Sequence, residues 1–423
     1  MRARSTTPTP RTLAIIAVPT VLAAIGWGVL RNTDPTFAKD VLPILQQSCQ
    51  DCHRLQGRNL GGMVAPMPLT TYEEVQPWAA GIKLAVESGR MPPWHTSPEQ
   101  HGVFRNERVL TEDEINTIVS WVDAGTPEGD PDDAPPPVTF ASETTGWSIG
   151  EPDLVVQLPE PYLVRDEVED EYVNFSVDIT LDMLPEPRWI KAVEFRTGSK
   201  AVHHVIARPL GGIAPGYEPR VYEDGYGRLL RTGTTVTFEM HYHKAKGPGT
   251  AVWDQTQAAI IFYEPGEEIK HVVEGESLGM FGFRIPAGAS DYSYASTFTF
   301  EKDVNILWFN PHMHLRGKAA KYVATFPDGR EEVLLHVPKY DFNWQHTYYF
   351  TEPVFAPKGT RIDLTLWWDN SADNPANPNP NREVRWGRPT PDEMGFGWMS
   401  FTEVDPRSII VGEEIPDDLP RPI

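Results

Sequence analysis

The repeated pattern of short apolar runs after Gly150 limits the fold more than any other feature of the chain. Runs rich in Val, Ile, Phe, Tyr and Trp alternate with Gly, Pro, Asn and Asp. Short strands divided by turn residues are typical of β-sandwiches and jelly rolls. The 41 prolines and 33 glycines provide for many turns. We therefore expect a mainly β protein, and a length of 423 residues predicts two or three domains.

The first 31 residues have a different composition. Three arginines precede an uncharged stretch, residues 12–30, that is long enough to span a bilayer marginally. Trp27 and Arg31 resemble the interfacial end of such a helix, and no clear cleavage site follows. We interpret residues 1–31 as an uncleaved signal anchor, with a cleaved signal peptide as the second interpretation. Both predict export, to the periplasm and, with the anchor, at the inner membrane.

The chain is strongly acidic, with a net charge of −22. Nucleic-acid phosphates and anionic lipid surfaces repel such a chain. We therefore expect no nucleic-acid partner, and membrane contact only through the N-terminal segment.

The two cysteines of the chain lie three residues apart, in the sequence "CQDCH". C-x-x-C-H is the attachment signature of c-type haem, in which Cys49 and Cys52 bind the haem covalently and His53 binds its iron. A thioredoxin-like dithiol would need a βαβ context, which this stretch lacks. The motif predicts one haem c.

Helical patterns surround this motif. Apolar residues recur at helical spacing over residues 37–48. Thr111 and Glu114 form a capping box before a helix expected to stop at Gly125. We expect residues 35–130 to form a small all-α cytochrome c-like domain.

A sixth ligand to the haem iron is expected downstream, from Met63, Met67 or Met91. Met91 begins "MPPWH", and the prolines make a rigid loop that directs its thioether. We favour Met91 and interpret Met63 and Met67 as loop or core residues. Histidine and methionine together raise the haem potential, which suits electron transfer.

Six of the nine histidines of the β-rich part come in pairs: His203 and His204, His241 and His243, His312 and His314. His271, His336 and His346 are single. Alternate residues of a strand share a face, so His312 and His314 point the same way. Imidazole suits zinc, copper, iron and nickel, and an added thioether selects copper(I). Met394 and Met399 are available near the C-terminus.

The order of these motifs, HH, HY, H-x-H-x-x-G-K and D-E-M, resembles the copper type II, ascorbate-dependent monooxygenases. That family includes peptidylglycine α-hydroxylating monooxygenase and dopamine β-monooxygenase. The resemblance covers about residues 147–412, and the haem motif ahead of it resembles bacterial members fused to a cytochrome c. It implies two tandem jelly-roll β-sandwich domains, each with one copper, and a solvent-filled cleft between them.

The predicted domains are a signal anchor or signal peptide (1–31), the haem domain (35–130), a linker (131–146), the first copper jelly roll (147–286), the second copper jelly roll (287–412) and a tail (413–423).

Carried over motif by motif, the resemblance implies two copper sites. The electron-transfer copper would be held by His203, His204 and His241. The copper that binds oxygen and substrate would be held by His312, His314 and Met394. We interpret His243 as a surface residue or a neighbour of the ligands, and His336 and His346 as exposed strand residues.

The chain departs from the family pattern at the substrate side. Asn310 stands where peptide-hydroxylating members carry an arginine that binds the substrate carboxylate. Tyr and Asn positions after the methionine are replaced by Trp398 and Phe396. The resemblance therefore does not extend to a peptide glycine, and Phe396 and Trp398 indicate an apolar or aromatic pocket wall.

These patterns predict a copper monooxygenase that hydroxylates a C–H bond of a small organic substrate: R–H + O₂ + 2e⁻ + 2H⁺ → R–OH + H₂O. Electrons from an upstream redox protein or small reductant would enter at the haem. They would pass to the three-His copper and then to the His₂Met copper.

Three alternatives remain at this point. One is a non-catalytic copper and haem electron-transfer or copper-binding protein on the same fold. Another is a carbohydrate-binding β-sandwich with a tethered cytochrome. An esterase based on "GESLG", residues 275–279, would need a parallel strand–turn–helix context.

Overall fold

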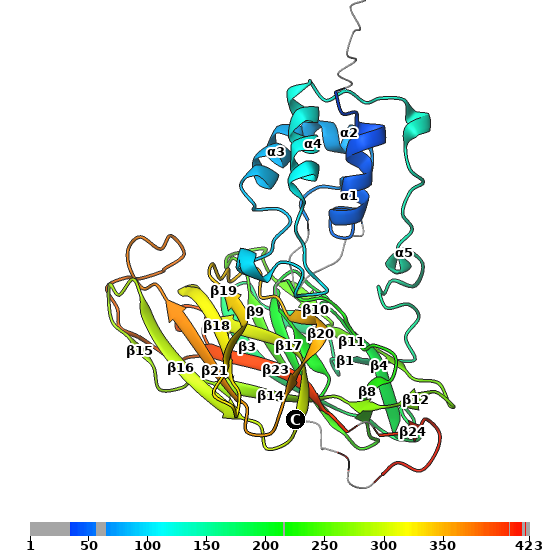
Figure 1. Cartoon of the computed structure of the whole chain (residues 1–423), viewed down its shortest axis with the longest axis vertical. Helices are drawn as coiled ribbons and strands as arrows, with labels where there is room; N and C mark the ends of the chain where they lie inside the picture. Colours follow the sequence, from blue (N-terminus) through cyan, green and yellow to red (C-terminus); the bar gives the residue numbers. More distant parts are fainter. Residues whose placement is uncertain (1–33, 56–64, 215, 406, 417–418, 420–423) are drawn as a thin grey trace, which may run out of the picture. The chain divides into compact units, whose positions relative to one another are not determined.

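The computed structural model describes residues 34–55, 65–214, 216–405, 407–416 and 419 (Figure 1). The predicted anchor, residues 1–31, and the candidate ligand Met63 lie outside them. Within the described ranges, no helix combines the length and apolar character needed to cross a membrane. Helices precede residue 146 and strands follow Leu154, so the prediction of a mainly β protein is confirmed.

The N-terminal part is helical. Its elements are η1 Phe37–Val41, α1 Leu42–Ser48, α2 Tyr72–Val75, η2 Gln76–Trp78, α3 Ala79–Glu87, η3 Pro98–Gln100, α4 Glu112–Asp123, η4 Pro131–Asp133 and α5 Ala141–Thr145. The predicted helix after Thr111 is confirmed as α4. Thr111 N–H donates to the Glu114 carboxylate, and Glu114 N–H donates to Thr111 Oγ1, which is the predicted capping box. Gly125 follows with a φ of 86°, a conformation that ends helices.

A first group of strands forms two sheets. One sheet has the order β1-β11-β4-β8-β13 with β7 on β4, and the other has the order β3-β9-β5-β6. The strands are β1 Leu154–Gln157, β3 Asp170–Asp178, β4 Arg188–Arg196, β5 Val202–Arg208, β6 Gly211–Ile213, β7 Arg220–Val221, β8 Tyr226–Leu230, β9 Thr235–His243, β11 Gln257–Phe262 and β13 His271–Val272. Side chains of both sheets share one core, which includes Val193, Val205 and Phe238.

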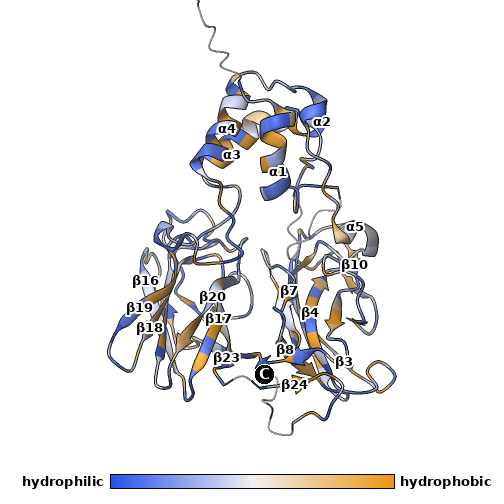
Figure 2. Cartoon of the chain, turned by 45° about the vertical axis from the view of Figure 1, so that its right-hand side comes forward, coloured by the Kyte–Doolittle hydropathy of each residue, from blue (hydrophilic) through white to orange (hydrophobic). Residues whose placement is uncertain are grey.

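A second group of strands also forms two sheets, with the orders β14-β23-β17-β20 and β16-β21-β18-β19. The strands are β14 Glu274–Gly279, β16 Tyr292–Thr299, β17 Val304–Met313, β18 Gly317–Thr325, β19 Glu331–Val337, β20 Tyr348–Ala356, β21 Arg361–Trp368 and β23 Gly395–Glu403. They share a core that includes Ile306, Tyr322 and Leu364. Figure 2 shows hydrophobic and hydrophilic stretches along both groups of strands.

Short strands complete the fold in pairs: β2 Tyr162–Val164 with β10 Val252–Asp254, β12 Glu268–Ile269 with β24 Ile409–Ile410, and β15 Arg284–Ile285 with β22 Val384–Arg385. β14 and β15 thus pair with β23 and β22, which follow the predicted boundary at residue 286, although both β14 and β15 precede it. The "GESLG" stretch lies within β14, which pairs antiparallel with β23. It is not the strand–turn–helix that an esterase nucleophile requires.

The segment between the helices α3 and α4 lies on the second group of strands. Ser97 N–H donates to His336 O at 2.9 Å, and Arg105 N–H donates to Tyr349 O at 2.9 Å. Phe104 is buried in the core of that group. Backbone bonds and a buried aromatic ring therefore join this part of the predicted haem domain to β19 and β20.

Candidate metal centres

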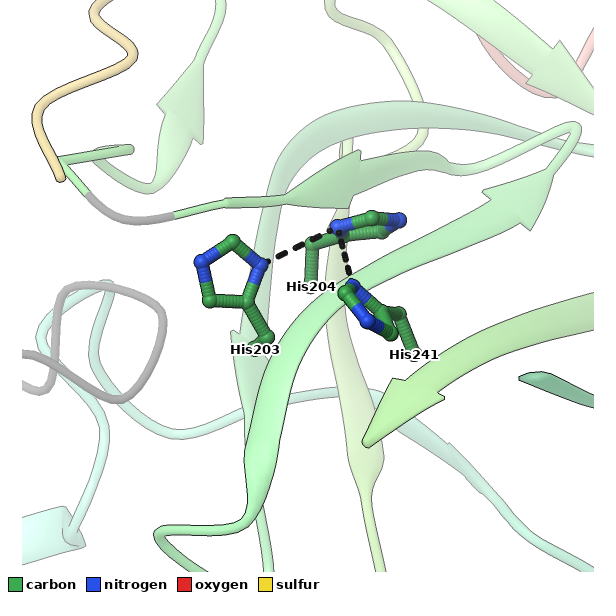
Figure 3. A group of neighbouring side chains, drawn as sticks. All are labelled: His203, His204 and His241. Carbon is green, nitrogen blue, oxygen red and sulfur yellow. Dashed lines mark hydrogen bonds between the residues drawn. The ribbon is translucent and has the colours of Figure 1, made fainter. Parts of the chain in front are cut away.

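His203, His204 and His241 come together at one end of β5 and β9 (Figure 3). Nδ1 of His204 lies 3.4 Å from Nδ1 of His203 and 3.2 Å from Nδ1 of His241. Nitrogens bound to one tetrahedral ion at about 2.0–2.1 Å lie about 3.3–3.4 Å apart. The spacing of these nitrogens therefore fits a single metal ion.

A β-bulge explains how two adjacent histidines serve one site. Neighbouring residues of a regular strand point to opposite faces. The register of β5 on β9 shifts between Val202 and His204, and His204 pairs with His241. Bulges re-aim side chains in this way, so His203 and His204 both approach His241.

Asp170 fixes the ring of His241 from behind. Its Oδ1 lies 2.9 Å from Nε2 of His241, and Tyr172 stacks on the same ring at 4.2 Å. When Nε2–H donates to this carboxylate, Nδ1 keeps its lone pair for a metal. Burial alone raises the pKa of Asp170, but the hydrogen bond and charge of His241 lower it overall. Asp170 therefore stays ionised behind the ligand.

The three histidines are held as neutral bases. Burial, with the charges of His241 and His243, lowers the pKa of His203 to about 3. Burial also lowers the pKa of His204 well below its ordinary value. The pKa of His241 is lowered by burial and partly restored by Asp170. Protons compete weakly for these nitrogens at neutral pH, which favours metal binding.

An open cavity of about 720 Å³ lies beside this site, and its walls include His203, Asp170 and Phe342. His243 also lines the cavity. Its side chain is 49% exposed, and its Nδ1 lies 3.9 Å from Asp170. His243 is therefore a surface neighbour of the three-histidine group rather than a member of it.

His312 and His314 lie at the end of β17, and their outer nitrogens are fixed by neutral groups. Gln345 donates its amide N–H to Phe342 O at 3.0 Å, so its Oε1 faces His312 Nδ1 at 2.5 Å. Nδ1 of His314 lies 3.4 Å from Asp392 O. Both rings thus use Nδ1–H as a donor and leave Nε2 for a metal.

Nε2 of His314 is a buried nitrogen to which no group in the described part of the chain hydrogen-bonds. A buried polar atom of this kind calls for an explanation such as a bound ion. Burial lowers the pKa of His312 to about 4 and that of His314 well below its ordinary value. Both rings are therefore neutral and able to bind a metal.

The pairing of β17 with β23 ends one residue short of His314 and Met394. His312 pairs with Phe396 and Met313 pairs with Gly395, and one further step in the same register would oppose His314 to Met394. Residues opposite each other in an antiparallel pair share a face. Met399, the other candidate, is fully buried in the core on the opposite face. The geometry therefore favours Met394 over Met399.

Glu393 joins the two strand ends that carry these residues. Its carboxylate accepts the backbone N–H of His314 at 2.9 Å and that of Arg316 at 2.7 Å. Trp368 Nε1 donates to the same carboxylate at 3.2 Å. Burial raises the pKa of Glu393 to about 7. This buried carboxyl group holds the backbone of His314 beside that of Met394.

The two histidine groups are adjacent rather than separated by a solvent-filled cleft. The ring centroids of His204 and His312 lie 6.2 Å apart. Phe342 stacks on His203 at 4.6 Å and contacts His314 at 5.9 Å. One aromatic side chain thus touches both groups.

The three predicted pocket residues differ in their surroundings. Asn310 is buried; its amide donates to Gln345 O and His346 O, and its Oδ1 accepts from Tyr217 at 2.6 Å. Its hydrogen-bonding capacity is largely used within the protein. Phe396 and Trp398 stack on each other at 5.5 Å, and Trp398 contacts His312 at 5.7 Å. These two rings form an aromatic surface beside the second group.

The CQDCH motif forms a tight turn. His53 N–H and Cys52 N–H both donate to Cys49 O, at 2.9 and 3.1 Å. Cys49 and Cys52 are thiols rather than a disulfide, and burial raises the pKa of Cys49 to about 12. His53 Nδ1 lies 3.1 Å from Met67 O, which leaves Nε2 for iron. These residues fit covalent haem attachment.

The contact of His53 Nδ1 with Met67 O also distinguishes between two of the candidate sixth ligands, Met67 and Met91. The backbone of Met67 lies behind His53, on the side of the ring away from a bound iron. Met91 begins the loop that follows α3, and its N–H donates to Ala85 O at 3.1 Å. Met91 therefore remains the preferred candidate between these two.

The structure adds residues that the sequence did not single out. Asp170, Gln345 and Glu393 hold the rings or backbones of the candidate ligands. Asp170 and Gln345 lie in no motif, and Glu393 belongs to the D-E-M motif, from which only the methionine was predicted to be a ligand. The interpretation of His346 as an exposed residue is wrong, because His346 is 2% exposed. His346 precedes β20, and its neighbours Gln345 and Thr347 are buried as well, so no period-two pattern marked it in the sequence.

Comparison with known proteins gives no family. No protein-family model and no curated protein sequence matches the chain. Similar solved structures include the STIV MCP, with 8% identity over 60% of this chain and 97% of that chain, at a TM-score of 0.27. Infectious bursal disease virus VP2 subviral particle has 8% identity over 62% of this chain and 84% of its own, at a TM-score of 0.17. Scores this low do not define a shared fold and carry no functional argument.

Proposed function

We propose that this protein is an exported copper-dependent monooxygenase that hydroxylates a C–H bond of a small organic substrate with O₂. It would resemble the copper type II, ascorbate-dependent monooxygenases, with two jelly-roll domains behind an all-α cytochrome c domain. His203, His204 and His241 would hold one copper, and His312, His314 and Met394 the other. Copper at these sites would supply electrons and bind O₂.

The observation that carries this proposal is the composition of the face shared by β17 and β23. His312 lies on it, and the register continued one step beyond its last pair, Met313 with Gly395, would place His314 opposite Met394 on the same face. Met313 and Gly395 face the core. A thioether beside two imidazoles favours copper(I), the state that reacts with O₂. The three-histidine group beside it supports a second copper that stores an electron.

Phe396 and Trp398 support an apolar or aromatic substrate, since their stacked rings lie beside His312. Asn310 offers no charge to a substrate carboxylate and is engaged within the protein. We therefore propose a small organic substrate other than a peptide glycine.

The CQDCH turn supports one haem c as the entry point for electrons from a redox protein or small reductant. In the proposed order these electrons reach the three-histidine copper and then the His₂Met copper. Residues 1–31 would anchor the chain in the inner membrane, with the catalytic part in the periplasm.

The test is reductant-driven O₂ uptake by protein reconstituted with copper and haem, in the presence of small aromatic and aliphatic compounds. With isotopically labelled O₂, the proposal predicts one labelled oxygen atom in a hydroxylated product, detected by mass spectrometry. Haem reduction and reoxidation with no labelled product would contradict it. That result would favour a non-catalytic electron-transfer protein.

A further inference from the structure

A cavity that no candidate copper ligand lines lies at one edge of β4. On this edge β7 pairs with Ala192 and Val193, and no described strand continues the pairing. A cavity of about 330 Å³ lies beside the next residues of the strand, 194–197. Its other walls include Arg54, which follows the CQDCH motif, and Tyr349 of β20. The end of the β7 pairing therefore leaves room for a ligand.

The charged side chains of this cavity contrast with the net charge of −22 of the whole chain. Its lining holds two glutamates and three arginines, Arg54, Arg196 and Arg220. Both glutamates are engaged within the protein. Glu194 accepts the backbone N–H of Ser148 at 2.7 Å and its Oγ–H at 3.0 Å. Glu218 forms an ion pair with Arg108, which lies outside the lining. The acidic side chains are thus occupied elsewhere.

Arg220 is a largely buried cation that forms no ion pair with a described residue. Its guanidinium lies 5.4 Å over the ring of Trp308 and is hydrogen-bonded to the hydroxyl groups of Tyr222 and Tyr349. Its Nε is buried and has no hydrogen-bond partner in the described part of the chain. A charge removed from water is costly unless an opposite charge accompanies it. Arg220 therefore calls for an anionic ligand.

Arg196 repeats this arrangement on β4. Its guanidinium lies 4.2 Å over the ring of Trp147, and it too has no acidic partner within ion-pair distance among the described residues. Gly146 makes room for it, because a Cβ there would lie 3.2 Å from Arg196 Nη1. Gly211 does the same for Arg220, at 3.0 Å. Aromatic rings and close backbone thus hold both guanidinium groups in place, which reduces the entropy lost when a ligand binds.

We propose that this cavity binds the carboxylate of a small organic acid through Arg196 and Arg220. A guanidinium presents parallel N–H donors that match the two oxygens of a carboxylate. The cavity also has apolar walls, formed by Phe195, Leu210 and Ile213. These walls favour an organic acid over an inorganic anion, since its hydrocarbon part would be buried against them. The site is independent of the proposed copper chemistry.

Two sources of such a carboxylate are available. One is a free organic acid taken from solution. The other is a propionate group of the proposed haem c. Arg54 lines the cavity and donates to Gln50 O within the haem-attachment turn at 2.9 Å, so the cavity adjoins that turn. The two sources differ in what the haem-loaded protein still binds.

The experiment titrates the full haem- and copper-loaded protein by calorimetry with hexanoate, benzoate, adipate and inorganic phosphate. For a free organic acid, we expect saturable binding of at least one carboxylate, tighter than that of phosphate. Arg196→Gln and Arg220→Gln are each expected to weaken this binding about tenfold or more, because each removes a charged hydrogen-bond donor. Phosphate bound as tightly as every carboxylate, or carboxylate binding equally strong in both variants, would contradict the proposal.

Arg188→Gln is the matched control. Arg188 lies on the same strand, with its guanidinium 4.7 Å over the ring of Phe262, but it does not line the cavity. This variant is expected to bind the acid with the affinity of the parent, and an equal loss would overturn the proposal. Haem content and circular dichroism verify the fold of each variant. Arg196→Lys, which keeps the charge but not the two parallel donors, is expected to bind with intermediate affinity.

A haem propionate as the source gives a different result in the same proteins. The occupied cavity of the haem-loaded parent would then bind none of the added acids. Removing a cation beside the propionate leaves its negative charge uncompensated, which favours ferric haem and lowers the reduction potential. We expect this decrease, measured by spectroelectrochemistry, in Arg196→Gln and Arg220→Gln but not in Arg188→Gln. Absence of acid binding together with unchanged reduction potentials would overturn the proposal.

Discussion

The two histidine groups use the same side chain in opposite ways. In the first group Nδ1 atoms converge, and a carboxylate, Asp170, holds the far nitrogen of His241. In the second group the neutral oxygens of Gln345 and Asp392 hold Nδ1, and Nε2 is left for a metal. At His241, His312 and His314, the hydrogen-bond partner of one ring nitrogen leaves the other nitrogen available to a metal.

This difference has a chemical consequence. A carboxylate behind a histidine makes the ring a stronger base. Three imidazoles, of which His241 has such a partner, suit a copper that cycles between its two oxidation states. Neutral partners and the thioether of Met394 make the second group softer, which favours copper(I). The contrast predicts an electron-storing site beside an oxygen-binding site.

The largest effect is expected from removing the thioether of Met394. Met394→Leu removes the soft ligand and keeps the side chain apolar and similar in size. We expect the rate of O₂ uptake coupled to product to fall more than about 100-fold. Substituting a residue that only hydrogen-bonds to a metal ligand typically lowers activity by about 10- to 100-fold, and losing a ligand should lower it further. The measurement is labelled-product formation per chain. Met399→Leu, in the core, is expected to retain this rate. Equal losses in Met394→Leu and Met399→Leu would contradict a specific role of the Met394 thioether.

The next effect tests the carboxylate. Asp170→Asn is expected to weaken copper binding at the three-histidine site by about 10- to 100-fold, because it removes the charge behind His241. Copper titration followed by EPR measures both sites at once. Glu169→Gln removes a charge from the same cavity wall without touching a ligand. If Glu169→Gln weakened binding as much as Asp170→Asn, general charge rather than ring orientation would explain the effect.

A smaller effect is expected from the neutral partner. Gln345→Leu removes the acceptor that orients His312, and we expect copper affinity at the second site to fall by about tenfold, the lower end for such changes. The three-histidine site serves as the internal control in the same titration. A loss larger than that of Asp170→Asn would reverse the proposed ranking of the two partners.

A last effect concerns the pH dependence of the stability of the metal-free protein. The pKa of His312 is about 4 when folded and about 6.5 when unfolded. Because the unfolded chain takes up the proton first, stability is complete above about pH 6.5, falls as the pH drops toward 4 and then levels off. We expect His312 to account for about 3 kcal/mol of this loss. Urea unfolding at several pH values measures the free energy of unfolding. His312→Asn should make this free energy less dependent on pH. The same pH dependence in the parent and in His312→Asn would contradict the argument that burial lowers the pKa of His312.

Sequence patterns predicted the candidate ligand residues and their strands better than the pairing of those strands. Strand alternation placed His312 and His314 on one face, and β17 follows the predicted run. The same rule would separate His203 from His204, and the bulge that unites them depends on pairing with β9. Turn composition predicted many short strands but not which of them share a sheet.

The partners of the ligands could not be predicted because they are distant in sequence. Asp170 and His241 are 71 residues apart, and Glu393 and His314 are 79 apart. Only the register of the sheets brings them together. His346 was mispredicted for another reason: it precedes β20, in a stretch where Gln345, His346 and Thr347 are all buried. A period-two pattern in the sequence identifies the buried face of a strand. Contacts between residues of different sheets can be identified only from the three-dimensional structure.

The central claim is that two chemically distinct copper sites lie side by side in one chain. Its most direct test is the copper content of purified, reconstituted protein, compared with His204→Ala and His312→Ala. The account predicts two copper ions per parent chain and one in each variant, with the all-nitrogen EPR spectrum lost only in His204→Ala. A parent chain that binds one copper or none, or a single substitution that empties both sites, would contradict it.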